Sequence, residues 1–321
     1  MGFRKTMVKI GAAKFLWFIG MFFQLCLLKG QDAPYSQYYS NLVHLNPAFA
    51  GSRNESRINL FYRNQWPRSG ANFQSFGVSY DMPIKKYNSG FGIIAANDIT
   101  GIFIEPSLDL IYSYKFKPLP RLFVSFAFQA GVVQKYLTDL NFADGSETII
   151  KGFSKIFPDF ALGSTAFYKD YYAGFSADHL LKPYQGTTKS AEEQLNRKFT
   201  LFAGYIHHLP ERLMNQIRIV SPNLLIQTQG YQQNICWGSS FQYDNLISGI
   251  WIRNDFHLHL DAAIFMIGFR NQNWRFAYSY DMNLGKKTIK PLGSHEISFV
   301  VLFETRSRKK LKALTCPTFL L

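Results

Sequence analysis

The chain has 321 residues, a formal net charge of +14, 47% hydrophobic and 17% aromatic residues. Its three cysteines are too few for a disulfide scaffold, and a chain of this length does not need one. Such a basic chain could bind nucleic acid, but its N-terminus predicts export. We therefore expect no nucleic-acid partner, and favour anionic lipid head groups or an acidic protein face.

Residues 1–30 have the pattern of a secretory signal peptide. Arg4, Lys5, Lys9 and Lys14 precede the apolar run Phe15–Leu28, and polarity returns at Lys29-Gly30. The run is shorter than the roughly 20 residues of a membrane-spanning helix, which disfavours a retained anchor. Cys26 lacks the small preceding residues of a lipoprotein site. Cleavage after Gly30 would remove five basic residues and leave a net charge of 14 minus 5, or +9.

Residues 31–56 form an irregular, aromatic segment that we expect to lie outside the strands, in the periplasm or as a plug. Beyond it, segments of about ten residues alternate apolar with polar or small side chains, which is typical of a transmembrane barrel. The predicted strands number about fourteen: Ile58–Trp66, Phe73–Met82, Gly90–Ala96, Leu108–Phe116, Leu122–Tyr136, Asp159–Tyr168, Tyr171–Ala177, Lys198–His207, Arg218–Gln227, Gln233–Tyr243, Leu246–Arg253, Phe256–Phe269, Trp274–Asn283 and Ser294–Phe303.

The alternation also predicts which side chains face lipid. In the fourth segment Leu108, Leu110, Tyr112 and Tyr114 alternate with polar residues, and in the fifth Phe126 and Phe128 do. We expect these apolar side chains outside and the polar ones in the lumen.

The connections alternate in length, as they do in outer-membrane barrels, which have short periplasmic turns and longer external loops. Lys117–Arg121, Lys169-Asp170, Asp244-Asn245 and Arg270–Asn273 are tight, whereas Leu137–Pro158 and Asp178–Arg197 are the longest. Asn254-Asp255 is an unexpectedly short outer turn. The pattern favours an all-β transmembrane antiparallel barrel over residues 57–303, in the outer membrane, rather than the alternative of a soluble β-sandwich.

Residues 304–321 form a basic tail that we expect in the periplasm. Its cluster of Arg306, Arg308, Lys309, Lys310 and Lys312 suits an acidic or peptidoglycan-associated secretion component.

No convincing catalytic set occurs. His295 and Glu296 are adjacent on a predicted strand and therefore point to opposite faces. His257, His259 and His295 could be lined up as metal ligands, but histidines at a period of two more often share one face of a sheet. We expect neither an enzyme nor a cofactor.

Several motifs resemble the PorP/SprF family of type IX secretion and gliding proteins. After Ser36-Gln37-Tyr38-Tyr39 the motif residues are Asn46, Pro47, Ala48 and Gly51, then Arg63, Gln65 and Trp66, then Tyr278-Ser279-Tyr280-Asp281, then His295 and Glu296, and finally Cys316 and Pro317 in the tail. Two extra leucines after Phe319 depart from the family pattern. The resemblance implies a barrel that serves secretion or holds a secreted client, such as an adhesin, at the surface, without a cofactor.

The expected function is therefore non-enzymatic support of type IX export or surface anchoring, with outer-membrane lipid, the client and periplasmic secretion components as partners. Phe142, Phe153 and Tyr184, in the two longest connections, are candidate client contacts because aromatic residues are enriched at interface hot spots. The alternatives are a passive channel or hydrophobic-solute transporter and, more remotely, a barrel-embedded hydrolase.

Overall fold

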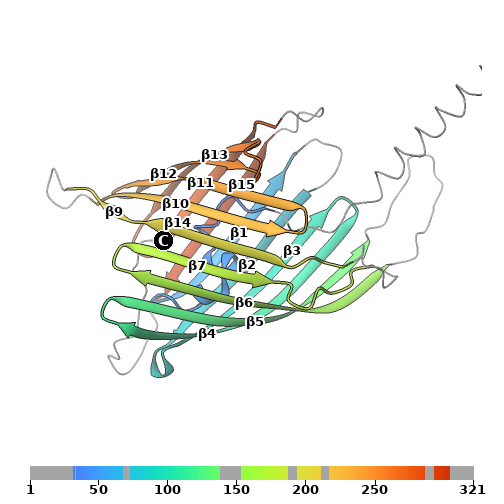
Figure 1. The fold of residues 1–321 in the computed structure, drawn as a ribbon, viewed down its shortest axis with the longest axis horizontal. Helices are drawn as coiled ribbons and strands as arrows, with labels where there is room; N and C mark the ends of the chain where they lie inside the picture. Colours follow the sequence, from blue (N-terminus) through green and yellow to red (C-terminus); the bar gives the residue numbers. More distant parts are fainter. Residues whose placement is uncertain are drawn as a thin grey trace, which may run out of the picture.

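The computed structural model describes residues 32, 34–67, 73–137, 153–186, 194–210, 217–285 and 293–303. Strands dominate this part of the chain (Figure 1): β1 (Ser56–Gln65), β2 (Phe73–Ile84), β3 (Ser89–Thr100), β4 (Phe103–Leu119), β5 (Leu122–Leu137), β6 (Ser154–Tyr168), β7 (Tyr171–Asp178), β8 (Lys198–Tyr205), β9 (His207–His208), β10 (Arg218–Gln229), β11 (Gln232–Tyr243), β12 (Leu246–Asn254), β13 (Leu260–Arg270), β14 (Trp274–Asn283) and β15 (Ser294–Phe303).

The strands form one closed antiparallel barrel. Each strand pairs with its neighbour in the chain, and β15 pairs with β1 along ten residues, from Ser56 opposite Phe303 to Gln65 opposite Ser294. β8 and β9 both pair with β10 and follow each other across Ile206, so they occupy one strand position in the ring. The predicted barrel of about fourteen strands is confirmed.

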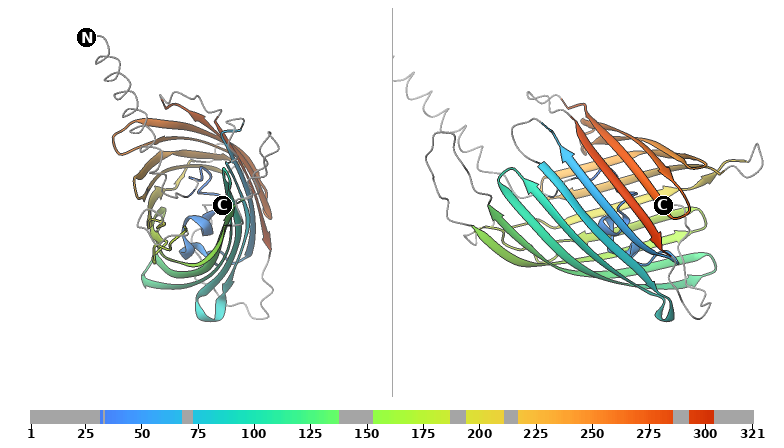
Figure 2. Two further views of the ribbon diagram at one scale, coloured as in Figure 1. Left: turned by 90° about the vertical axis from the view of Figure 1, so that its right-hand side faces the viewer. Right: turned by 180° about the vertical axis from the view of Figure 1, so that it is seen from behind.

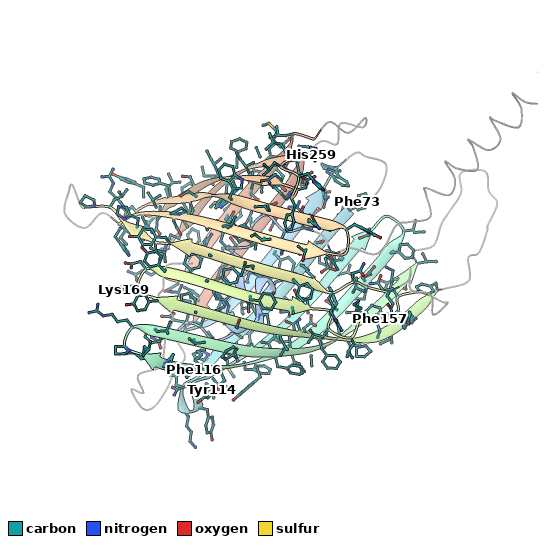
Figure 3. All side chains as sticks on the ribbon, in the orientation of Figure 1. Phe73, Tyr114, Phe116, Phe157, Lys169 and His259 are labelled. Carbon is teal, nitrogen blue, oxygen red and sulfur yellow. The ribbon has the colours of Figure 1, made fainter. Side chains whose placement is uncertain are left out.

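The predicted faces are confirmed as well. On β4, Leu108 and Tyr112 are 51% and 52% exposed, whereas the intervening Asp109 and Ser113 are buried. On β5, Phe126 is 54% exposed beside the buried Ser125. Because successive side chains of a strand point to opposite faces, an apolar outer surface encloses a polar lumen. Figure 3 shows aromatic side chains, among them Tyr114 and Phe116, along the outside of the wall.

The two ends of the barrel differ. One end carries the two-residue turns 120–121, 169–170 and 244–245 and the first residue of β1; we call it the turn end, at the left of Figure 1. The other carries connections 138–153 and 179–197 and is the loop end. Connection 209–217 is a longer one at the turn end.

Some strand bounds differ from the prediction. β13 starts at Leu260 instead of Phe256, because Asp255 accepts hydrogen bonds from the backbone and ring nitrogens of His259 and Leu258 adopts a positive φ of 61°. The outer connection 255–259 is therefore longer than expected. β4 starts earlier than expected, at Phe103.

Residues 34–55 lie inside the ring of strands, where Figure 2 (left) shows the N-terminal segment in blue. They include a four-residue helix, α2 (Leu42–Leu45), and a 3-10 turn, η1 (Pro47–Phe49), in which Ala48 and Phe49 are almost completely buried. In the part of the chain that the structure describes, no helix is long and apolar enough to span a membrane.

Candidate functional site

The lumen and the segment that occupies it form the candidate functional site. The segment runs along the barrel from end to end. Asp32 contacts His179, Lys198 and Gln229, which lie where β7 and β10 end and β8 begins, at the loop end. Gly51 lies near Met82 and Gly90, at the turn end, where β1 then starts.

A buried charge network lies where β15 closes onto β1; we call Ser36, Gln37, Arg63, Arg253, Asp281 and Glu296 the seam cluster. Arg63 on β1 donates to Glu296 on β15 at 2.9 Å and to Asp281 on β14 at 3.0 Å. Arg253 on β12 contacts the same Asp281 oxygen at 3.3 Å. Arg63, Glu296 and Asp281 are each at most 2% exposed, so the ions depend on one another for stabilisation.

The N-terminal segment binds directly to this network. The backbone N–H groups of Ser36 and Gln37 donate to the Glu296 carboxylate at 2.8 and 3.1 Å. The Ser36 hydroxyl donates to Asp281 at 2.5 Å and accepts from Arg63 at 3.1 Å. Gln37 donates from its amide to the Glu296 carbonyl, and its amide oxygen accepts from Ser298 at 2.6 Å. Arg253 on β12 also donates to the Ser36 hydroxyl, at 3.3 Å, so charged residues of four strands hold two residues of the segment.

Aromatic packing continues the contact toward β10 and β12. Tyr39 stacks on Trp251 with ring centroids 4.7 Å apart, and the Arg275 guanidinium lies over the Tyr39 ring, 5.6 Å from its centroid. Tyr38 and Trp251 both donate to the Asn223 side-chain oxygen, at 2.5 and 2.7 Å. These rings pack within the lumen, where Tyr38 and Trp251 satisfy their polar atoms, whereas the buried Tyr39 hydroxyl has no hydrogen-bond partner among the described residues.

On the opposite side, residues 46–51 press against what we call the glycine wall, formed around Gly90 and Gly163. A Cβ on Gly90 would lie 2.1 Å from the Ala50 carbonyl oxygen, and one on Gly163 would lie 2.2 Å from the Asn46 side-chain oxygen. Asn46 donates to the backbone carbonyls of Ser164 and Phe175 at 3.1 and 2.9 Å. Glycine at these positions therefore permits a close approach that any side chain would prevent.

The turn end of this contact is polar. Gly51 N donates to Asp81 at 2.8 Å, and the same carboxylate pairs with Arg57 at 2.6 Å. Ser113 and Lys115 on β4 donate to the carbonyls of Ala50 and Gly51. The segment's free backbone groups thus find partners on the wall, as buried backbone groups must.

A third contact, the outer cluster, holds the other end of the segment: Asp32, Asp159, His179 and Lys198. His179 lies between Asp159 and Asp32 at 2.8 and 3.0 Å, and Lys198 reaches Asp32 at 3.1 Å. Burial disfavours the charge on His179, but Asp32 and Asp159 outweigh it and hold the pKa of His179 well above its usual value. Burial likewise opposes charge on Asp32, yet His179 and Lys198 hold its pKa well below the usual range.

Some of the motif residues lie inside the barrel, and others lie on its outer face or at a strand end. Asn46, Pro47, Ala48, Gly51, Arg63 and Glu296 are inside and contribute to the contacts above. His295 points the other way and bonds to the Tyr278 hydroxyl at 2.8 Å, which confirms the opposite facing of His295 and Glu296. Gln65 ends β1, and Trp66 follows it at a positive φ of 54° with its ring against Phe73.

The remaining predicted site residues lie at the loop end or outside the described ranges. Phe153 accepts a backbone hydrogen bond from Leu137, and Tyr184 forms a bridge with Gln194 across connection 179–197. Outside the described residues lie the signal peptide and Phe142, Arg306, Arg308, Lys309, Lys310, Lys312, Cys316 and Pro317.

Sequence reasoning did not select Arg253, Asp81, His179 or Lys198 as site residues. For Arg253, Asp81 and Lys198 the signal was present, because a charge at a lumen-facing strand position among small or polar residues needs a partner. His179 lies just after β7 and had no such signal. Of the candidate metal ligands, His259 pairs with Asp255 and His295 with Tyr278. Within the described ranges, no three His, Cys, Asp or Glu residues form a group that could hold a metal ion.

Comparison with known proteins identifies the family of this chain. The sequence profile of the family described as "Type IX secretion system membrane protein PorP/SprF" matches residues 27–301. The chain belongs to this family. Its barrel fold and membership of a membrane secretion family place this PorP/SprF protein in the outer membrane.

The solved structures that resemble this chain do so distantly and at low identity. The CymD monoaromatic hydrocarbon channel is 10% identical, with a TM-score of 0.45 over 84% of this chain and 94% of its own. The P. putida toluene transporter TodX is 9% identical, with a TM-score of 0.44 over 81% and 93%. The KdgM porin is 7% identical, with a TM-score of 0.38 over 77% and 99%. A search of the curated proteins returns no match.

Proposed function

We propose that this PorP/SprF protein is a non-enzymatic outer-membrane component that supports export or surface anchoring of one secreted client, such as an adhesin, in type IX secretion and gliding. The observation that carries the proposal is the occupied lumen of a barrel from a secretion family. The seam cluster, the glycine wall and the outer cluster bind the N-terminal segment at both ends and in the middle.

A filled lumen favours a binding role over passive transport. Opening a path along the barrel would require breaking the hydrogen bonds of Ser36 and Gln37 to the carboxylates of the seam cluster, together with the stacking of Tyr39 on the wall. A hydrogen bond to a charged group contributes about 1.5–3 kcal/mol, and several would have to break together, so spontaneous opening would be rare. We therefore treat the predicted segment 31–56, up to the first residue of β1, as a plug.

The client would bind at the loop end, which we assign to the cell surface because external loops are the longer ones in such barrels. Connections 138–153 and 179–197 lie there, with Phe142, Phe153 and Tyr184 as candidate contacts, and Asp32 brings the beginning of the plug to the same end. At the turn end the basic tail, with Arg306, Arg308, Lys309, Lys310 and Lys312, would attach to an acidic or peptidoglycan-associated partner in a salt-sensitive way.

The test is surface proteomics on a deletion strain beside liposome swelling with the purified protein. We expect one secreted protein to disappear from the surface and to return with the wild-type gene, while the liposomes do not swell. Phe153→Ala with Tyr184→Ala should restore it poorly, whereas Tyr171→Ala, an exposed aromatic at the turn end, should restore it fully. An unaltered surface proteome together with freely swelling liposomes would establish the channel alternative.

A further inference from the structure

A crescent of basic side chains lies at the turn end, on three consecutive turns. Lys85 and Lys86 follow β2, Lys117 and Arg121 flank the β4–β5 turn, and Lys169 follows β6. All but Lys85 are exposed, and Lys169 is visible at this end in Figure 3. Because β2 to β7 are neighbours in the ring, these cations border one continuous arc of the wall.

Two turns of the crescent repeat one arrangement. Lys86 lies over the exposed ring of Tyr87 at 5.1 Å, and Lys169 lies over the exposed ring of Tyr168 at 5.5 Å. Lys117 lies instead over Phe123 at 5.3 Å, a partly buried ring that packs against the lumen. A ring positions the ammonium group through its negative face while leaving N–H donors free for another acceptor. An amphipathic ring beneath a cation is also the pairing that suits the boundary between lipid tails and head groups.

Apolar side chains extend from the crescent along the lipid-facing wall. Tyr87, Leu119 and Tyr171 are each 59% exposed beside the cations, and Tyr114 and Phe126 continue down the outside. A ligand with an anionic head and long apolar chains would therefore match both parts of this surface.

Basic side chains are densest on this arc. Its three turns carry five basic residues and the acidic Asp170. On the far side, Arg218 lies over the ring of Tyr243 and Arg270 donates to Gln242, beside the described turns 244–245 and 271–273. A general attraction of the whole barrel end for anions would not be distributed in this way. The arc therefore has the features of a local binding surface.

We propose that the crescent binds the phosphate head groups of anionic phospholipids in the periplasmic leaflet of the outer membrane. The Lys86, Lys117, Arg121 and Lys169 side chains contact the phosphates, and the acyl chains lie along the exposed aromatic wall below them. The site is separate from the lumen and does not depend on the client.

Native mass spectrometry of the full-length protein in detergent, with added phosphatidylglycerol or phosphatidylethanolamine, tests the proposal. We expect the wild type to retain phosphatidylglycerol about fivefold better at low salt, with the preference falling as salt rises, because exposed charges are screened. Lys86→Gln with Lys117→Gln should reduce the preference at least twofold.

The matched control removes two lysines at the loop end, Lys155→Gln with Lys182→Gln, and changes the net charge equally. It should leave the preference intact. Equal retention of the two lipids by the wild type, or equal losses in both double variants, would overturn the proposal. Two results together would assign the surface to an acidic protein instead. The wild type would show no lipid preference, and its chemical cross-links to a periplasmic protein would disappear only in the crescent variant.

Discussion

The seam cluster and the glycine wall hold the same short segment by different physical means. At the seam, Arg63 lies between two buried carboxylates, and charge-assisted hydrogen bonds to Ser36 fix direction and register. At the wall, Gly90 and Gly163 admit the backbone of residues 46–51 so closely that shape decides the contact. The seam cluster should therefore tolerate changes in side-chain shape but not in charge. The glycine wall should tolerate changes in charge but not in side-chain size.

Removing the central cation should give the largest effect. Arg63→Leu leaves the Glu296 carboxylate buried without its ion-pair partner and should lower the free energy of unfolding by about 3–5 kcal/mol. Urea unfolding followed by the gel shift of the unboiled barrel measures it. Tyr62→Leu, on the lipid face of the same strand, is the control and should have little effect.

A second substitution sharpens the same experiment. Arg63→Leu combined with Glu296→Gln removes the buried charge that has lost its partner. The double variant should therefore be more stable than Arg63→Leu alone, although it carries one more substitution. Strictly additive losses would show that shape, and not charge, governs the seam.

A single methyl group should break the contact at the wall. Gly90→Ala places a Cβ against the Ala50 carbonyl and should cost about 1–3 kcal/mol while increasing conductance in planar bilayers, because the segment must move. Gly92→Ala on the same strand meets only side-chain atoms, of Ala50 at 3.3 Å and of Ile111 at 3.4 Å, and should cost less than half as much. Equal effects of the two variants would contradict a steric role for Gly90.

The smallest effect should be a dependence on pH at the outer cluster. The raised pKa of His179 means that its contribution to stability is fully present below its unfolded value and is lost as pH rises through the folded pKa. The lowered pKa of Asp32 adds a contribution that is lost as pH falls through its own folded value. The Asp32 end of the segment should therefore be held at neutral pH and released in alkali.

Labelling of Pro34→Cys on intact cells by a membrane-impermeant maleimide follows this release. The rate is divided by that of Tyr231→Cys, an 83% exposed position at the loop end, to remove the intrinsic effect of pH on the thiol. The ratio should rise with pH in the wild type and be flat in His179→Gln. A ratio independent of pH in the wild type would exclude titration of the cluster.

The barrel could be predicted from the sequence because its determinants are local. Alternation such as that around Phe126 needs only neighbouring residues, and the strands and faces agree with it. The errors fall where local rules compete, as in the turn closed by Asp255 and His259 ahead of β13. The seam cluster depends on partners such as Ser36 and Asp281, 245 positions apart. Its charges were visible in the sequence, but their pairing was not.

The position of the seam cluster sets an order for assembly. Arg63 belongs to the first strand, Glu296 to the last, and Ser36 precedes both in the chain. The segment along the lumen must be inside before β15 pairs with β1, because afterwards it would have to thread into a closed barrel. A chain that stops before β14 lacks Asp281 and Glu296, the two carboxylates that bind Ser36 and Gln37. Only a chain that includes β14 and β15 can therefore hold its N-terminal segment through the seam cluster.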